Sequence, residues 1–191
     1  MLPRCTLAGL VAISLASASL YAQSAVVHVP APVPQMREFD YLLGEWSYVA
    51  KTQTPGVPPV FQGTWRAWRL DDGRGIMDEY RAVDDSGHIA YYGLTVRTWD
   101  AGAGHWNIWY IDRSLNGQWG STQTGEARFE SGEMHLLQRG AGSMLRIRYY
   151  NVQPDRFSWS ADRSTDGGAT WTIGAIAIEA RRVAKSASGD R

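Results

Sequence analysis

Apolar and polar residues alternate in many short segments between residues 37 and 183. Residues 145–149 (LRIRY) and residues 92–97 (YGLTVR) are two such segments. Alternation with period two puts one face of a β-strand against a core and the other face toward solvent, which is typical of antiparallel sheets. In residues 145–149 we therefore expect Leu145, Ile147 and Tyr149 to face inward and the two arginines to face solvent.

Nine turn signals rich in Gly, Asn, Asp and Pro separate these segments, which predicts about ten strands with short connections. A helical pattern is limited to a turn or two at residues 37–43. An up-and-down meander leaves two unpaired edges unless it closes on itself. The sequence therefore predicts an all-β fold: a single antiparallel up-and-down β-barrel of about eight to ten strands, with a short N-terminal helical turn.

The two ends of the chain differ from this middle part. Residues 1–25 combine Arg4, an apolar run over residues 7–15 and small residues after it, which predicts a secretory signal peptide and an exported, periplasmic or extracellular protein. An uncleaved membrane anchor is the alternative. Residues 26–36 hold three alternating prolines and predict an extended linker, residues 37–183 form the barrel domain, and the polar residues 184–191 are expected to be a disordered tail.

Charge and cysteine content narrow the function classes. Lys and Arg total 19, and Asp and Glu also total 19. The chain therefore lacks the excess of basic residues that would indicate nucleic acid as a partner, and we expect no nucleic-acid binding. The only cysteine is Cys5, inside the expected signal peptide, so we expect the mature chain to lack disulfides and thiol chemistry. The four histidines are not spaced as metal ligands, and no catalytic constellation stands out, so we expect no metal, no cofactor and no catalytic residues.

Residues 164–171 (STDGGATW) resemble the Asp-box of sialidases. In such a hairpin, Asp166 is expected to accept hydrogen bonds from backbone N–H groups, Gly168 to supply a positive φ, and Trp171 to pack against the hairpin. The chain has one box and no blade-length repeat. The motif therefore predicts a structural hairpin near the end of the barrel and not a sialidase.

Residues 39–48 (FDYLLGEWSY) place a helical turn before Gly44-x-Trp46, which resembles the start of lipocalin and wider calycin barrels. With the terminal hairpin, the chain resembles a bacterial lipocalin-like family of unknown function. The resemblance implies that Trp46 plugs the closed end of the barrel and that an arginine near the end of the last strand covers it. This chain offers Arg181 or Arg182 there, and we assign Arg181.

The candidate ligand-binding residues are aromatic. In residues 92–96 and 106–110 one row is apolar, whereas the alternate row holds residues such as Thr95 and Asn107. We expect the apolar rows to face inward and Trp65, Tyr92, Trp106 and Tyr110 to line a cavity for a small apolar or aromatic molecule. For Trp65 the parity is open, because Trp68 competes for the inner face of the same strand.

Other functions stay open. Rings can fill a core without any ligand. A lipocalin-like enzyme would use a small polar set inside the barrel, such as Tyr80, Tyr92 and Arg97, and a filled barrel would act through its rim on another protein. Arg148-x-Tyr150 resembles the carboxylate clamp of fatty-acid-binding barrels, but the alternation favours a solvated arginine there. The volume and lining of the interior discriminate between these alternatives.

Overall fold

The computed structural model describes residues 33–184, apart from residues 72, 85, 87, 88, 114–116 and 121. The expected signal peptide and most of the expected linker and tail lie outside the described residues, so those assignments stay predictions. The end of the linker at residue 36 is wrong, because Pro34–Arg37 form a 3-10 helix in which Met36 is buried. Two short 3-10 helices, η1 (Pro34–Arg37) and η2 (Asp40–Leu42), precede the first strand. Met36 in η1 and Leu42 in η2 are buried.

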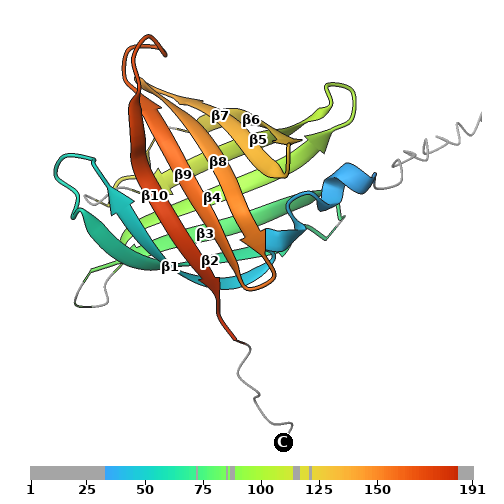
Figure 1. The fold of residues 1–191 in the computed structure, drawn as a ribbon, viewed down its shortest axis with the longest axis horizontal. Helices are drawn as coiled ribbons and strands as arrows, with labels where there is room; N and C mark the ends of the chain where they lie inside the picture. Colours follow the sequence, from blue (N-terminus) through green and yellow to red (C-terminus); the bar gives the residue numbers. More distant parts are fainter. Residues whose placement is uncertain are drawn as a thin grey trace, which may run out of the picture. The chain divides into compact units, whose positions relative to one another are not determined.

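Ten strands follow, and they are antiparallel to their neighbours: β1 (Gly44–Thr52), β2 (Val60–Arg69), β3 (Gly75–Val83), β4 (Ile89–Asp100), β5 (His105–Arg113), β6 (Gln123–Glu130), β7 (Glu133–Gly140), β8 (Ser143–Gln153), β9 (Arg156–Ser164) and β10 (Thr172–Arg182). Each strand pairs with the next, and β1 pairs with β10, which closes the barrel (Figure 1). Closure leaves no unpaired strand edge. The predicted fold class is confirmed.

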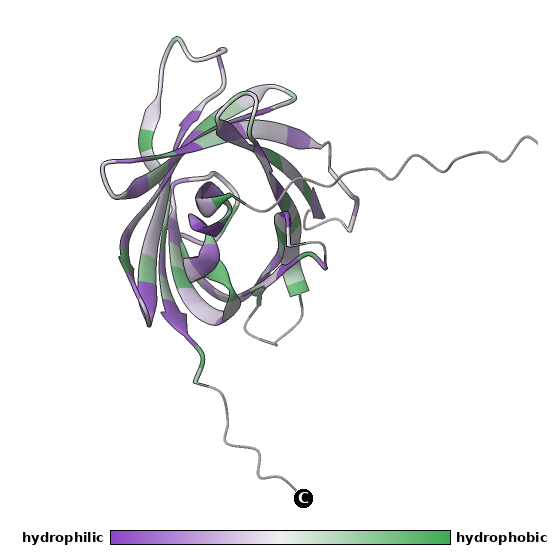
Figure 2. Cartoon of the chain, turned by 90° about the vertical axis from the view of Figure 1, so that its right-hand side faces the viewer, coloured by the Kyte–Doolittle hydropathy of each residue, from purple (hydrophilic) through white to green (hydrophobic). Residues whose placement is uncertain are grey.

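The two 3-10 helices plug one end of the barrel. Figure 2 looks onto this end and shows the helical turns within the ring of strands. Phe39 is fully buried, and its ring meets the ring of Trp106 edge-on at 5.1 Å. Trp46 packs edge-on against Phe157 at 4.8 Å and donates from Nε1 to the Leu42 carbonyl oxygen at 2.8 Å. Aromatic contacts therefore fill this end and make it the closed one.

Arg182 covers Trp46, as the Gly-x-Trp motif implies. Its guanidinium lies 4.0 Å from the centre of the indole ring and donates to the carbonyl oxygen of Leu43 at 2.7 Å. The assignment to Arg181 is wrong: Arg181 pairs with Ser47, and its side chain is exposed. Gly44 has a φ of +112°, and a Cβ there would lie 2.7 Å from the Arg182 guanidinium, so both conformation and space favour glycine.

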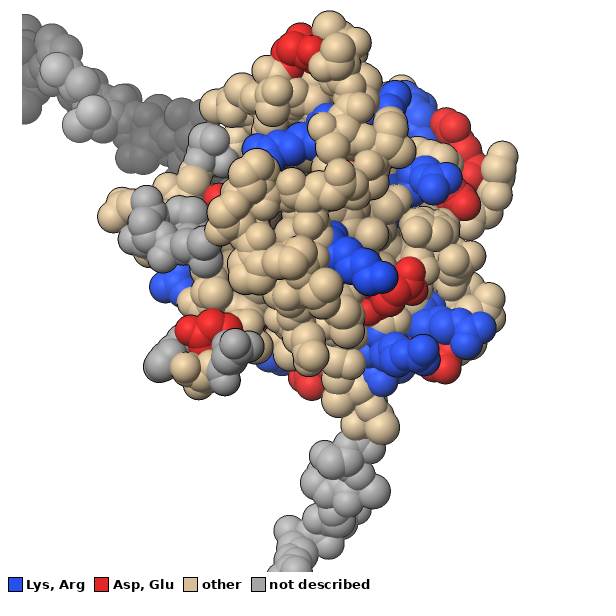
Figure 3. Space-filling model, turned by 60° about the vertical axis from the view of Figure 1, so that its left-hand side comes forward, with Lys and Arg blue, Asp and Glu red and all other residues tan. Residues whose placement is uncertain are grey.

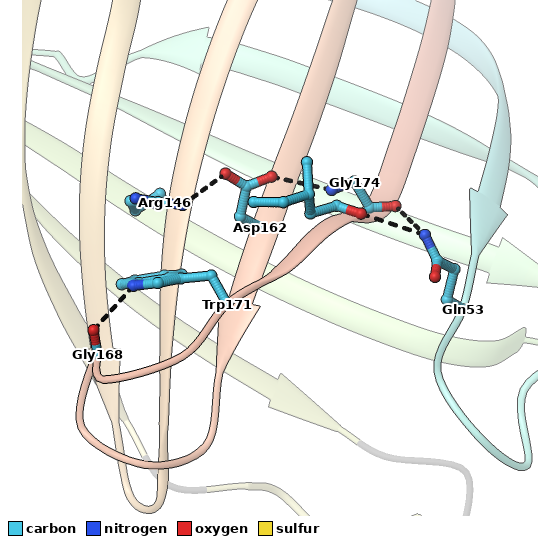
Figure 4. A network of polar contacts seen from close by, with 7 residues as sticks. Gln53, Arg146, Asp162, Gly168, Trp171 and Gly174 are labelled. Carbon is cyan, nitrogen blue, oxygen red and sulfur yellow. Dashed lines mark hydrogen bonds and ion pairs between the residues drawn. The ribbon is translucent and has the colours of Figure 1, made fainter.

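The Asp-box forms the β9–β10 hairpin. Asp166 accepts hydrogen bonds from Ser164 Oγ at 2.8 Å and from the Thr170 backbone N–H at 2.9 Å. Gly168 has a φ of +97°, and its carbonyl oxygen accepts from Trp171 Nε1 at 2.9 Å. The Arg146 guanidinium lies 4.0 Å from the centre of the Trp171 ring (Figure 4). The contacts are those of a structural hairpin stabilised by its own side chains.

The direction of each strand face decides which predicted residues reach the interior. Ile147 and Tyr149 are buried, and with Leu145 they line the interior, as predicted. On β2, Trp65 is buried and Trp68 is 37% exposed, so Trp65 takes the inner face. On the outside, register pairs connect the half-exposed apolar residues Trp68, Met77, Val96 and Trp109 across β2–β5.

Candidate functional site

The half of the barrel away from the plug encloses a cavity of about 830 Å³. Most of its wall is apolar or aromatic. Its rings are those of Phe61, Trp65, Tyr80, Tyr91, Tyr110, Tyr149 and Trp159. Isoleucines and leucines from β5, β7, β8 and β10 cover much of the remaining wall. A cavity of this size and lining is typical of small-molecule sites.

The mouth of the cavity lies at the end of the barrel opposite the plug. Thr54, Val57 and Pro58, in the β1–β2 connection, border it, as does Asp84 after β3. Asp112, at the end of β5, lies on the same side as Asp84. The rim therefore combines apolar side chains with two carboxylates.

A buried ion pair forms the base of the cavity. Asp78 is 0% exposed and Arg97 is 1% exposed, and the guanidinium donates to the Asp78 carboxylate. Arg97 also donates to the Tyr149 hydroxyl oxygen at 3.1 Å and lies 5.0 Å from the ring centre of Phe39. Burial raises the pKa of Asp78, and the charge of Arg97 opposes that rise. The pair thus lies between the cavity and the plug, and its two opposite charges compensate each other.

Buried tyrosines add further polar groups to the interior. The hydroxyls of Tyr91 and Tyr110 are hydrogen-bonded, and Tyr91 donates to Asp112 Oδ2 at 3.0 Å. Tyr80 stacks on Tyr48 with ring centres 4.7 Å apart, and burial raises the pKa of Tyr80 to about 12. Burial also raises the pKa of Tyr91 and of Tyr110. These hydroxyls are therefore neutral at physiological pH.

The structure brings two of the four predicted ligand residues to the cavity. Trp65 and Tyr110 line it. Trp106 is fully buried but lies against the plug, where its Nε1 donates to Glu38 Oε2 at 3.0 Å. It faces inward, as expected, but is outside the cavity wall.

The expectation that Tyr92 and its row face inward is wrong. The Tyr92 hydroxyl donates to Glu79 Oε2 at 2.9 Å on the outer face of the barrel, where the Tyr92 ring meets the exposed ring of Trp119 edge-on. The inner row of β4 contains Thr95 and Arg97 instead. The buried carboxylate of Asp78 gives Arg97 a partner, so this polar row can face inward.

This orientation also separates the polar set considered for an enzyme. Tyr80 lines the cavity, Arg97 is paired at its base, and Tyr92 is outside. Among the described residues, no group of three His, Cys, Asp or Glu side chains could hold a metal ion. In the same residues, no helix has the length and apolar character needed to cross a membrane.

Sequence reasoning missed Tyr91, Asp78 and Arg163, which all line the cavity. The sequence does hold one sign of which row of β4 faces inward, namely the glycine at position 93. A Cβ at this position would lie 2.6 Å from the Tyr110 hydroxyl, so the strand needs a glycine where a large ring crosses its inner face.

No protein-family model and no curated protein matches this sequence. Solved structures do. The S-type phycobiliprotein lyase CPES from Guillardia theta matches with a TM-score of 0.52 at 12% identity, over 76% of this chain and 90% of that chain. Rv2717c from M. tuberculosis matches with a TM-score of 0.50 at 15% identity, over 81% of this chain and 100% of that chain. At such identities the likeness shows the fold alone, a lipocalin-like β-barrel.

Proposed function

We propose that this protein binds a small apolar or aromatic molecule inside the barrel. The observation that carries the proposal is the cavity of about 830 Å³, with its wall of rings and aliphatic side chains. A barrel that acted only through its rim would have no need of such a space, because aliphatic or aromatic side chains could fill it.

Polar atoms at the base of the cavity support the proposal. Asp78 Oδ1, Arg97 Nε and Trp65 Nε1 are buried and make no well-formed hydrogen bond among the described residues, although Trp65 and Thr95 lie close enough to Asp78 to lower the pKa of its carboxyl. Buried polar groups of native proteins normally have partners, and bound molecules or ordered water can supply them. All three residues border the cavity.

We also propose that the chain is exported and belongs with bacterial lipocalin-like proteins. The support is the leader-like pattern of residues 1–25, the Gly44-x-Trp46 motif and the terminal hairpin. The phycobiliprotein lyase supports the barrel fold of this proposal, and its activity is not part of it.

Titration with N-phenyl-1-naphthylamine, an uncharged aromatic probe, tests the binding proposal. We expect saturable quenching of tryptophan fluorescence. Trp65→Phe should reduce the quenched amplitude, because the Trp65 indole borders the cavity. Trp109→Phe is the matched control, since Trp109 is 42% exposed on the outer face, and it should leave the amplitude unchanged.

A blocking variant separates the cavity from the surface. Leu145→Trp places a large ring in the cavity wall and should weaken binding at least tenfold. Leu94→Trp, at an outward position on β4, should leave affinity unchanged. Equal affinity in both variants, with both folded by circular dichroism, would refute binding inside the barrel.

A further inference from the structure

Arg163 stands out among the charged residues of the cavity. It lies one residue before the end of β9, is half-buried and lines the cavity near its mouth. Its neighbours on the inner wall are Leu145 across the strand pair and Ala161 along the strand. The side chain makes no hydrogen bond or ion pair with any described residue, so its charge has no counterion among them.

The other charged residues of the cavity wall have partners. Arg97 and Asp78 neutralise each other at the base. Asp112 accepts a hydrogen bond from Tyr91, and Asp84 makes an interaction of its own. Uncompensated charge in a partly desolvated place costs free energy, and an anion bound beside the arginine would lower that cost.

The position of Arg163 separates it from the acidic residues of the mouth. In the closed barrel β9 is four strands from β5 in one direction and four strands from β3 in the other. Asp112 is the last residue but one of β5 and Asp84 follows β3, so both lie on the opposite side of the opening. An anion beside Arg163 therefore avoids the two carboxylates.

We infer that the ligand carries a carboxylate, which Arg163 binds at the mouth while the apolar body occupies the cavity. This inference rests on the proposed function and names the ligand class. A guanidinium matches the two oxygens of one carboxylate with two parallel N–H bonds. The base of the cavity does not suit an anion, because Arg97 is already paired with Asp78. The ligand therefore enters body first and leaves its acidic group at the rim.

Pyrenebutyric acid and pyrenebutanol test this inference, since they share the apolar body and differ in the head group. Energy transfer from tryptophan to pyrene measures both affinities. At about pH 7 and low salt, we expect the acid to bind about tenfold more tightly than the alcohol. Arg163→Gln should remove this difference by weakening the acid only. Arg156→Gln, an exposed arginine on the same strand, is the charge-matched control and should keep the difference.

Each outcome decides between the two proposals. Equal affinity of acid and alcohol in the unmodified protein, or an acid preference that survives Arg163→Gln, overturns the role of Arg163 and leaves the cavity as a binding site. Failure of both probes and of N-phenyl-1-naphthylamine overturns the binding function itself. If Arg163→Gln does not fold, the comparison of acid and alcohol in the unmodified protein still decides the ligand class.

Discussion

Removing Arg97 should destabilise the barrel strongly, because it leaves the Asp78 carboxylate buried without a counterion. Both side chains are almost fully buried, at 2% and 1% side-chain exposure, so solvent screens the pair little. Breaking a buried ion pair on one side costs about 3–5 kcal/mol. For Arg97→Met we expect that loss in urea unfolding followed by tryptophan fluorescence, and a fall in Tm of about 6–20 °C.

The double variant identifies the cause. Asp78→Leu combined with Arg97→Met removes both charges, so it should cost less than Arg97→Met alone. Without Arg97, burial raises the pKa of Asp78 further, and the folded state then favours the protonated carboxyl. The deficit of Arg97→Met should therefore shrink as the pH falls from about 7 toward the ordinary carboxyl value of 3.8. The reasoning would be refuted if Arg97→Met lost less than about 1 kcal/mol, or if the loss of the double variant equalled the sum of the losses of Arg97→Met and Asp78→Leu. Either result would indicate that water in the cavity solvates the charges.

Four further predictions concern the hairpin, the closed end, the tyrosines and the leader. Asp166→Ala should lower the Tm and leave ligand affinity unchanged. Hydrogen bonds from Thr170 and Ser164 lower the pKa of Asp166, so the stabilisation that Asp166 contributes is present above pH 3.8 and is lost as the pH falls through the lowered pKa. Acid unfolding of the unmodified protein and of Asp166→Ala measures this loss. Arg182→Ala should cost about 1–2 kcal/mol in urea unfolding, whereas Arg181→Ala should cost less than about 0.5 kcal/mol. Burial raises the pKa of Tyr80 to about 12, so absorbance at 295 nm should show fewer ionised tyrosines at about pH 11 in the folded protein than in the protein unfolded in urea. The stability that depends on the neutral Tyr80 hydroxyl should be lost as the pH rises from about 10 through 12. N-terminal sequencing of exported protein should find cleavage within about residues 18–25, and an intact Met1 on membrane-bound protein would contradict it.

The barrel could be predicted because its strands alternate and most of its connections are short and marked by glycine and aspartate. Alternation also gave the correct inner face on β8, where Ile147 and Tyr149 face inward and Arg146 pairs with Asp162 outside. On that strand the inner row is apolar and the outer row is charged, so the two faces differ in the usual sense.

The same reasoning failed on β4 because both faces of this strand depart from the usual pattern. Its outer row, with Leu94 and Val96, joins the apolar residues of neighbouring strands on the outside. Its inner row carries Arg97, whose burial depends on Asp78, a residue 19 positions away in the sequence. Period two reveals two faces but cannot decide which is inner when the inner face holds a charged pair.

Position along the barrel axis was also hidden in the sequence. Trp106 and Tyr110 share an inner row of β5, yet Trp106 packs against Phe39 of the plug and Tyr110 lines the cavity. Alternation places both rings inside, and only the location of η1 and η2 separates a ring that closes the barrel from one that borders the cavity.

This division along the axis also explains how one aromatic-rich sequence can stabilise a fold and still leave room for a ligand. At the plug, rings such as Trp46 and Phe157 contact each other edge-on, and the 3-10 helices fill the space between them. Toward the mouth the helices are absent, so the rings of Tyr110 and Trp159 have the cavity on one side. Substitutions near the mouth should therefore change ligand affinity with little loss of stability. Substitutions at the plug should reduce stability and leave ligand affinity nearly unchanged. The face shown in Figure 3 mixes acidic and basic side chains without a large region of one sign.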